Sequence, residues 1–213
     1  MKDNFLNIDG AIVVKNIAIA IQQNKDLLSD LDGIIGDGDH GINMNKGFSM
    51  SLEILNSNEI SFSNALMTVS DTLMNEIGGS MGPLYGVFFK RMAKISANEE
   101  RITAGVFQKM LNEATDALMA MGNAMPGDKT LVDTLTIARL RYNAAIANNL
   151  SFDFALAECA EGAEQGKEST RDMIAKIGRS ARLGERSKGH LDAGATSCSI
   201  IVKTMCDSII GLL

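Results

Sequence analysis

Apolar residues recur along the chain at intervals of three and four, the spacing that places side chains on one face of an α-helix. One such face, within residues 63–77, consists of Leu66, Val69, Leu73 and Ile77. Strand-like alternation is almost absent. The pattern predicts eight helices, near residues 10–31, 42–56, 63–77, 83–97, 102–121, 131–148, 152–177 and 194–212. No linker long enough to separate two domains interrupts them, so the sequence predicts one all-α domain over residues 1–213, an eight-helix up-and-down bundle.

Glycines gather in four of the seven connections between these helices, at residues 33–41, 78–86, 122–127 and 178–194. These are the first, third, fifth and seventh connections, and alternate connections of an up-and-down bundle lie at the same end. The other three, at residues 57–62, 97–102 and 148–152, are short, polar and free of glycine. Glycine is favoured where backbone approaches a ligand closely. The sequence therefore predicts a ligand site at one mouth of the bundle.

The first glycine-rich loop carries Asp32, Asp37 and Asp39. Aspartates before a helix often serve as N-caps or turn residues. Three of them, interspersed with glycines, favour instead a site for Mg²⁺, which takes carboxylate oxygens and shares its other positions with water and phosphate. A calcium EF-hand is disfavoured because no glutamate stands at the twelfth loop position.

The third and fifth glycine-rich loops leave alternatives open. In residues 78–86, Pro83 suits a first helical turn, whose backbone N–H groups would either bind phosphate or allow tight helix packing. Residues 122–130 resemble a Walker A loop, but Asp128 intervenes before Lys129 and no strand precedes them. Asp128 and Lys129 fit a local cap and a solvated charge equally well.

The seventh connection is long and concentrates basic residues in an acidic protein, namely Arg179, Arg182, Arg186 and Lys188. Such a loop is either a solvated basic segment or a source of guanidinium groups that stabilise phosphate charge. Carboxylates for Mg²⁺, backbone donors and mobile cations together are what phosphoryl transfer requires.

Composition restricts the partners and the compartment. A net charge of −6, with the seventh connection as the local basic exception, disfavours nucleic acid, and no apolar run is long enough for a membrane span. Residues 1–10 lack a basic segment followed by an apolar run, so the expected location is the cytoplasm. Three cysteines, Cys159, Cys198 and Cys206, match no zinc spacing, and Cys198 and Cys206 are expected to pack in the core.

Four stretches resemble the L subunit of bacterial dihydroxyacetone kinases and the matching C-terminal domain of the one-chain kinases: GDGDHGINMNKGF, GGSMGPLYG, PGDKT and GRSARLGERSKGHLDAGATS. The resemblance implies an eight-helix antiparallel barrel that holds ADP or ATP and two Mg²⁺ at one mouth. It also implies a separate K subunit, which binds dihydroxyacetone covalently on a histidine. Because this chain carries no fused substrate domain, the resemblance further favours rephosphorylation of a bound ADP by a phosphohistidine M subunit of the phosphotransferase system.

The resemblance assigns roles residue by residue. Asp32, Asp37 and Asp39 are implied as metal ligands, and Arg179 as the catalytic arginine on the phosphate side. The nucleotide contacts that it implies are His40, Gly41, Ile42, Asn43, Ser80, Met81, Gly122, Val132, Arg179, Asp192, Ala193 and Gly194. Three of these depart from the usual family residue: Met81 replaces serine, Val132 replaces methionine and Ala193 replaces proline.

Three rival functions remain at this point. The first is a kinase subunit of the same fold that acts on another short-chain sugar or polyol and exchanges ATP from solution. The second is a non-catalytic nucleotide-binding regulatory module, which the loss of a hydroxyl at Met81 keeps open. The third, a helical interaction protein without ligands, leaves the carboxylate cluster and the glycine placement unexplained.

Overall fold

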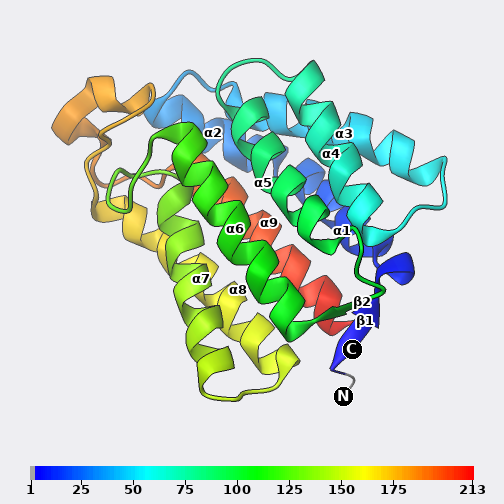
Figure 1. The fold of residues 1–213 in the computed structure, drawn as a ribbon. Helices are drawn as coiled ribbons and strands as arrows, with labels where there is room; N and C mark the ends of the chain where they lie inside the picture. Colours follow the sequence, from blue (N-terminus) through cyan, green and yellow to red (C-terminus); the bar gives the residue numbers. More distant parts are fainter. Residues whose placement is uncertain (1–2) are drawn as a thin grey trace.

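Helices account for almost all of the regular structure in the computed structural model, which describes residues 3–213 (Figure 1). The first two residues of the N-terminal stretch interpreted above lie outside the described residues. The nine α-helices of the described chain are α1 (Ala11–Gln23), α2 (Lys25–Ile35), α3 (His40–Asn56), α4 (Phe62–Glu76), α5 (Met81–Ser96), α6 (Ala104–Gly122), α7 (Leu131–Ala147), α8 (Phe152–Ser169) and α9 (Ala193–Ile210). The shorter elements are the strands β1 (Asn4–Leu6) and β2 (Arg101–Thr103) and the 3₁₀ helices η1 (Asn7–Asp9), η2 (Thr170–Asp172) and η3 (Ser180–Ser187).

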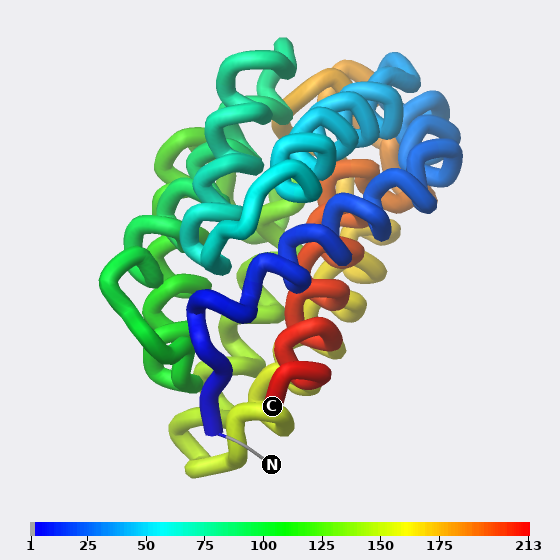
Figure 2. Tube along the Cα trace, turned by 90° about the vertical axis from the view of Figure 1, so that its right-hand side faces the viewer, coloured from blue at the N-terminus to red at the C-terminus, as the bar shows by residue number. Residues whose placement is uncertain are grey.

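The helices other than α2 close into a ring, and the arrangement can be followed in Figures 1 and 2. From α3 to α9 each helix packs against the next in the chain, and α9 packs against α1, which contacts α3. Apolar side chains from all eight helices meet inside in one buried cluster. Its aromatic rings pack edge to face, as do Phe48 and Phe89 with centroids 5.9 Å apart. The predicted all-α, up-and-down architecture is confirmed, and the three cysteines are buried, as expected for Cys198 and Cys206.

The ninth helix, α2, corrects the first predicted helix. Residues 10–31 do not form one helix, because the chain bends at Asn24 and α2 then continues to Ile35 beside α3. The side-chain amide of Asn24 donates to the carbonyl of Ala20 at 2.8 Å, while the backbone carbonyl of Asn24 accepts from the N–H of Leu28 at 3.0 Å. Asparagine thus ends one helix and begins the next. The bend carries α2 out of the ring and directs its C-terminal end toward the mouth.

The seventh predicted helix is also shorter than expected. Helix α8 ends at Ser169 rather than at residue 177. Two side-chain hydroxyls donate hydrogen bonds to backbone carbonyls of its last turn. Ser169 Oγ donates to the carbonyl of Gly166 and Thr170 Oγ1 donates to the carbonyl of Lys167, both at 2.7 Å. The chain then turns through η2 and leaves the ring.

A short antiparallel pair, which the sequence pattern did not predict, closes the end of the ring away from the glycine-rich loops. Strand β1 pairs with β2 so that Phe5 lies opposite Ile102. Just after β1, the Asn7 side chain donates to the carbonyls of Ser96 and Glu99, each at 2.8 Å, and accepts from the N–H of Ser63 at 3.1 Å. These contacts join the N-terminal segment to two of the polar connections.

The four glycine-rich connections lie together at the other end, at the upper left of Figure 1, as the sequence predicted. They follow α2, α4, α6 and α8 and form the mouth of the ring. Within residues 3–213, no helix combines the length and the apolar character needed to cross a membrane.

Candidate active site

A cavity of about 790 Å³ opens between the four mouth loops, within the usual size range for small-molecule sites. Most of the residues singled out from the sequence line it. Those brought together here are Asp32, Asp37, Asp39, His40, Asn43, Ser80, Met81, Gly122, Val132, Arg179, Asp192, Ala193 and Gly194.

Two expected contacts, Gly41 and Ile42, lie outside the cavity lining. Helix α3 begins at His40, so His40 and Asn43 share one face while the two residues between them turn away. Gly41 faces α2, where a Cβ atom would lie 2.1 Å from the carbonyl oxygen of Lys25, and Ile42 is 55% exposed. The expectation that Ile42 lines the site is therefore not supported.

The three aspartates converge at one side of the cavity. Asp32 lies in the last turns of α2, and Asp37 and Asp39 lie in the loop that follows. One carboxylate oxygen of each lies within 4.8 Å of the others. Gly38, with φ +78°, gives the loop its turn, and a Cβ atom on Gly36 would lie 2.2 Å from an oxygen of Asp32. Glycine at both positions lets three carboxylates meet.

Helix capping accounts for only one member of this cluster, Asp32. Asp39 occupies the N-cap position of α3, yet its side chain makes no capping hydrogen bond. The carboxylate of Asp32 instead accepts from the N–H of His40 at 3.3 Å. Hard oxygen donors converging in this way fit a divalent cation such as Mg²⁺.

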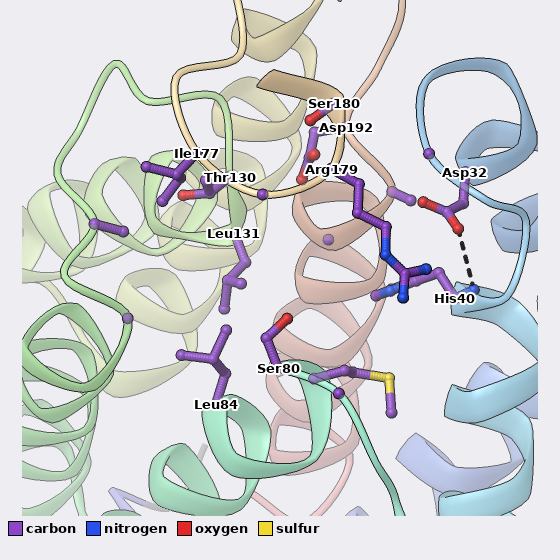
Figure 3. A pocket seen from close by; sticks show the side chains of 18 of the residues that line it. Asp32, His40, Ser80, Leu84, Thr130, Leu131, Ile177, Arg179, Ser180 and Asp192 are labelled. Carbon is purple, nitrogen blue, oxygen red and sulfur yellow. Dashed lines mark hydrogen bonds between the residues drawn. The ribbon is translucent and has the colours of Figure 1, made fainter. Parts of the chain in front are cut away.

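Arg179, from the long loop before α9, reaches two of these carboxylates, and its side chain extends beside Asp32 in Figure 3. Its guanidinium pairs with Asp37 and lies 3.5 Å from Asp39. The other three cations of the long loop, Arg182, Arg186 and Lys188, are exposed and do not line the cavity. The interpretation as a phosphate-side cation therefore fits Arg179, whereas these three are solvated.

His40 is held by a chain of hydrogen bonds from two other helices. Its Nε2 lies 2.9 Å from Ser197 Oγ on α9, and that hydroxyl lies 2.7 Å from the Tyr85 hydroxyl on α5. Burial lowers the pKa of His40, although the charge of Asp32 opposes this, so burial favours the neutral ring. The sequence reasoning missed Tyr85 and Ser197. Helical spacing offered a signal, since they lie one turn beyond Met81 and Gly194.

The N-terminus of α5 forms the floor of the cavity. Ser80 is its N-cap residue but makes no capping hydrogen bond, and its hydroxyl points into the cavity (Figure 3). Met81, in the first turn, lines the cavity beside it. The free N–H groups and the helix dipole favour an anion here.

The cavity has a charged side and an apolar side. In Figure 3, Asp32, His40 and Arg179 lie to the right, whereas Leu84, Leu131 and Ile177 lie to the left. Gly122 and Val132, expected near a nucleotide base, belong to the ends of α6 and α7 that border the same lining. Such a division suits a ligand with an apolar aromatic part and an anionic part.

Asp192 lies in the cavity wall as the N-cap of α9, where its carboxylate accepts from the N–H of Ala195 at 2.7 Å. Burial raises the pKa of Asp192 to about 6, against the opposing effects of that hydrogen bond and of Lys129. This carboxyl therefore titrates near neutral pH.

Lys129 corrects the interpretation of the fifth loop. It is not a solvated charge, since only 1% of the residue is exposed. Its ammonium donates to the carbonyls of Thr170 and His190, both at 2.5 Å, and burial lowers its pKa. Asp128 does act locally, because its carboxylate accepts from the N–H of Met125 at 2.7 Å. The partners of Lys129 are far away in sequence, so no local pattern indicated its burial.

Comparison with known proteins identifies the family. Residues 34–207 match the model of the DAK2 domain. The chain belongs to the DAK2-domain family. It is 37% identical to the "PEP-dependent dihydroxyacetone kinase, ADP-binding subunit DhaL" of Escherichia coli K12, over 85% of this chain and 87% of that one. It is 36% identical to the "PTS-dependent dihydroxyacetone kinase, ADP-binding subunit DhaL" of Lactococcus lactis, over 89% and 91% respectively.

The fold is shared with a solved structure. The dihydroxyacetone kinase of C. freundii, crystallised with AMP-PNP and Mg²⁺, superimposes on 98% of this chain with a TM-score of 0.72 and 21% identity. This chain spans about a third, 35%, of that kinase. The resemblance drawn from the four sequence motifs is confirmed at the level of the family.

Proposed function

We propose that this DAK2-domain chain is the nucleotide-binding, phosphoryl-transferring subunit of a dihydroxyacetone kinase. The observation that carries the proposal is the meeting of three aspartates and Arg179 at the charged side of a cavity whose other side is apolar. The names of the Escherichia coli and Lactococcus lactis relatives support the same assignment. Residues 1–213 would act as one nucleotide-binding domain, working in the cytoplasm.

The proposed ligand is ADP or ATP with two Mg²⁺ ions. Asp32, Asp37 and Asp39 would hold the metal, which would supply positive charge against the phosphates. The N–H groups at the start of α5 and the Ser80 hydroxyl would bind phosphate. Gly122 and Val132 would border the base.

Arg179 is the proposed catalytic residue. Its guanidinium is already directed at the acidic cluster, so it would lie beside the transferred phosphoryl group and stabilise the negative charge that develops there. The neutral His40 ring, fixed by Ser197, would accompany it without adding charge. The chain's own residues therefore orient the nucleotide and compensate charge, and no nucleophile is required of them.

The proposed partners are those that the family suggests. A separate K subunit would present dihydroxyacetone at the mouth and receive the γ-phosphate. The "PEP-dependent" and "PTS-dependent" names of the relatives favour a phosphohistidine M subunit of the phosphotransferase system as the donor that rephosphorylates bound ADP.

Native mass spectrometry of the purified protein, with and without EDTA, tests the binding half of this proposal. The expected result is an added mass of ADP plus two Mg²⁺ that disappears with the chelator. A protein that gains nothing in excess ADP, ATP and Mg²⁺ would falsify the assignment.

Reconstitution tests the transfer half. The expected result is phosphorylation of dihydroxyacetone when the chain is mixed with a loaded K subunit, a phosphorylated M subunit and catalytic ADP. Turnover with ATP alone would instead indicate an exchanging, ATP-dependent kinase. Nucleotide binding without transfer to any short-chain sugar or polyol would indicate a regulatory module.

A further inference from the structure

Residues 170–192, here called the arm, leave the ring after α8 and return at the start of α9. The arm is drawn in orange at the mouth in Figure 1 and includes η2 and η3. It carries Arg179, the residue that pairs with the acidic cluster. Besides Arg179, the middle of the arm is joined to the loop between α6 and α7, because the N–H of Lys176 donates to the carbonyl of Asp128 at 3.2 Å. Its position over the cavity also depends on how its two ends are fixed.

The ends of the arm are held close together. The N–H of Gly189 donates to the carbonyl of Arg171 at 2.7 Å, and the N–H of Asp192 donates to Thr170 Oγ1 at 3.1 Å. These bonds close the arm into a loop with a narrow base. Both bonds lie within the arm and do not join it to the rest of the cavity wall.

Lys129 joins the base of the arm to the cavity wall. It belongs to the loop between α6 and α7, on the side of the cavity where Leu131 and Val132 lie. Its ammonium donates at 2.5 Å to Thr170 at the beginning of the arm and also at 2.5 Å to His190 near its end. One side chain from outside the arm thus binds both ends of its base.

The Lys129 ammonium has no carboxylate partner within ion-pair distance in the described part of the chain, although Asp192 and Asp133 are close enough to act on its charge. Burying an ammonium costs free energy unless its hydrogen bonds are satisfied. Lys129 also adopts a left-handed backbone conformation, with φ +61°, which is unfavourable for lysine. The hydrogen bonds to the two carbonyls explain how a buried ammonium is accommodated on a residue with a strained backbone.

We propose that Lys129 is a positioning residue that fixes the arm to the base side of the nucleotide cavity, so that Arg179 is held at the phosphate side. The proposal rests on the proposed function for its kinetic consequence, but its structural half stands without any reaction. It assigns Lys129 no contact with the transferred group.

Lys176 supplies a matched control. It also joins the arm to the loop between α6 and α7, because its ammonium lies 3.4 Å from Asp128, but its side chain is 61% exposed. Lys129→Met and Lys176→Met therefore remove one ammonium each from the same pair of segments, one buried and one at the surface. The second change is expected to have little effect, as is usual for exposed ion pairs.

Hydrogen exchange of the ligand-free protein tests the structural half. In Lys129→Met, the amides of residues 170–192 are expected to exchange about tenfold faster or more, while α6 and α9 keep their protection. Lys176→Met is expected to match the unsubstituted protein. Unchanged exchange of the arm in Lys129→Met would overturn the proposal, whatever the protein catalyses.

Single-turnover transfer tests the kinetic half in the complex with the K subunit. Lys129→Met is expected to slow transfer about tenfold or more while changing the Kd of Mg²⁺–ADP less than about threefold, because the acidic cluster and the start of α5 are untouched. A loss of affinity in proportion to the loss of rate would make Lys129 a direct nucleotide contact and overturn the proposal. Absence of transfer in the unsubstituted protein would count against the proposed function alone, since the exchange comparison still decides the structural half.

Thr170→Val serves if Lys129→Met does not fold. It keeps the side-chain volume and leaves no buried charge, but it removes the acceptor for the Asp192 N–H at the same base, together with the donor to the Lys167 carbonyl in the last turn of α8. Thr170→Val is expected to have the same effects as Lys129→Met, but smaller ones. The amides of the arm should exchange faster and phosphoryl transfer should be slower, while the affinity for Mg²⁺–ADP is retained. An arm as protected as in the unsubstituted protein, with full transfer, would contradict the model.

Discussion

At the scale of single residues, Asp37 is the aspartate of the cluster that pairs most directly with Arg179, and its side chain remains 44% exposed. Asp32, by contrast, also accepts a backbone hydrogen bond at the start of α3. A change at Asp37 therefore removes charge from the cluster without unpairing a helix terminus.

Asp37→Asn is expected to weaken the binding of Mg²⁺–ADP about 100-fold or more, because a neutral amide oxygen replaces a charged ligand of similar size. Isothermal titration calorimetry measures the loss, and circular dichroism checks that the helices remain. Asp30→Asn is the control, since Asp30 is an exposed carboxylate on α2 that does not line the cavity. Equal affinities for the two variants would argue against metal binding by the cluster.

Arg179→Ala is expected to slow phosphoryl transfer about 100-fold or more while the Kd of Mg²⁺–ADP changes only a few-fold, because the guanidinium acts on charge that develops during transfer. Rapid-quench kinetics in the reconstituted complex measures the rate. Arg182→Ala, a neighbouring exposed arginine outside the cavity lining, should transfer normally. An unchanged rate in Arg179→Ala would remove Arg179 from the mechanism.

Asp192 gives the stability a pH dependence of definite sign. Its pKa is about 6 in the folded protein against an ordinary value of 3.8. The protonated carboxyl therefore contributes fully to the free energy of unfolding at low pH, and this contribution is lost as the pH rises through 6. Asp192→Asn does not titrate. The stability of this variant relative to the unsubstituted protein should therefore rise between about pH 4 and pH 7, by at most about 3 kcal/mol before screening by water in the cavity. Urea unfolding across this range measures it, and a flat or falling difference would contradict the assigned pKa.

Residue-level prediction from the sequence succeeded where the geometry is local. The acidic cluster lies within eight residues of chain and its glycines are interspersed with it, so composition alone indicated a cation site. Lys129 was beyond reach, because its two acceptors lie 41 and 61 residues away. The direction in which Gly41 and Ile42 face depended on where α3 begins, which periodicity locates only to within a few residues.

At the scale of elements, α8 lies unusually close to α7 because two glycines, Gly162 and Gly166, face the α7 backbone. A Cβ atom on Gly166 would lie 2.6 Å from Thr134 Cα and 2.7 Å from the carbonyl oxygen of Asp133. This contact places the end of α8, and hence the beginning of the arm, beside the N-terminal turns of α7.

Gly166→Ala is expected to reduce the free energy of unfolding by about 1–3 kcal/mol, because backbone atoms cannot yield to the added methyl as a flexible side chain would. Gly105→Ala is the control, since the nearest atom to its added Cβ, Thr103 Oγ1, is 4.0 Å away. That variant should be unchanged or slightly more stable, as alanine favours helix. Denaturant unfolding compares the two, and equal stabilities would show that α8 moves away from α7 without cost.

Helix boundaries set the limit of prediction at this scale. The bend at Asn24 contains neither proline nor glycine, and its cause is a side-chain hydrogen bond that many asparagines within helices do not make. The end of α8 depends in the same way on two hydroxyls. Apolar periodicity located the helices but carried no information about these polar terminations.

At the scale of the whole molecule, the two ends of the ring differ in kind. One end is joined by β1, β2 and Asn7, and the other is a mouth of four loops around a cavity. The alternation of glycine-rich and glycine-free connections predicted this difference. The strand pair escaped prediction because three-residue strands are too short to show alternation and their partners lie nearly 100 residues apart.

Addition of Mg²⁺–ADP is expected to protect backbone amides at the mouth alone. Residues 36–39, 77–80, 123–130 and the arm should exchange more slowly, because the ligand would bridge all four loops. The connections at residues 57–61 and 148–151 serve as an internal control and should not change. Hydrogen exchange monitored by mass spectrometry measures both. Protection confined to a single loop would contradict a shared site.

The strand β1 and the end of α9 both lie at the closed end of the ring, away from the mouth (Figures 1 and 2). Helix α9 has 18 residues and therefore spans about 27 Å between that end and the cavity wall. A tether attached after Leu213 would need about eight extended residues to reach back to the mouth. Shorter tags leave the nucleotide cavity clear, and a molecule fixed to a sensor surface through its C-terminus would turn its mouth outward, toward an arriving protein in solution.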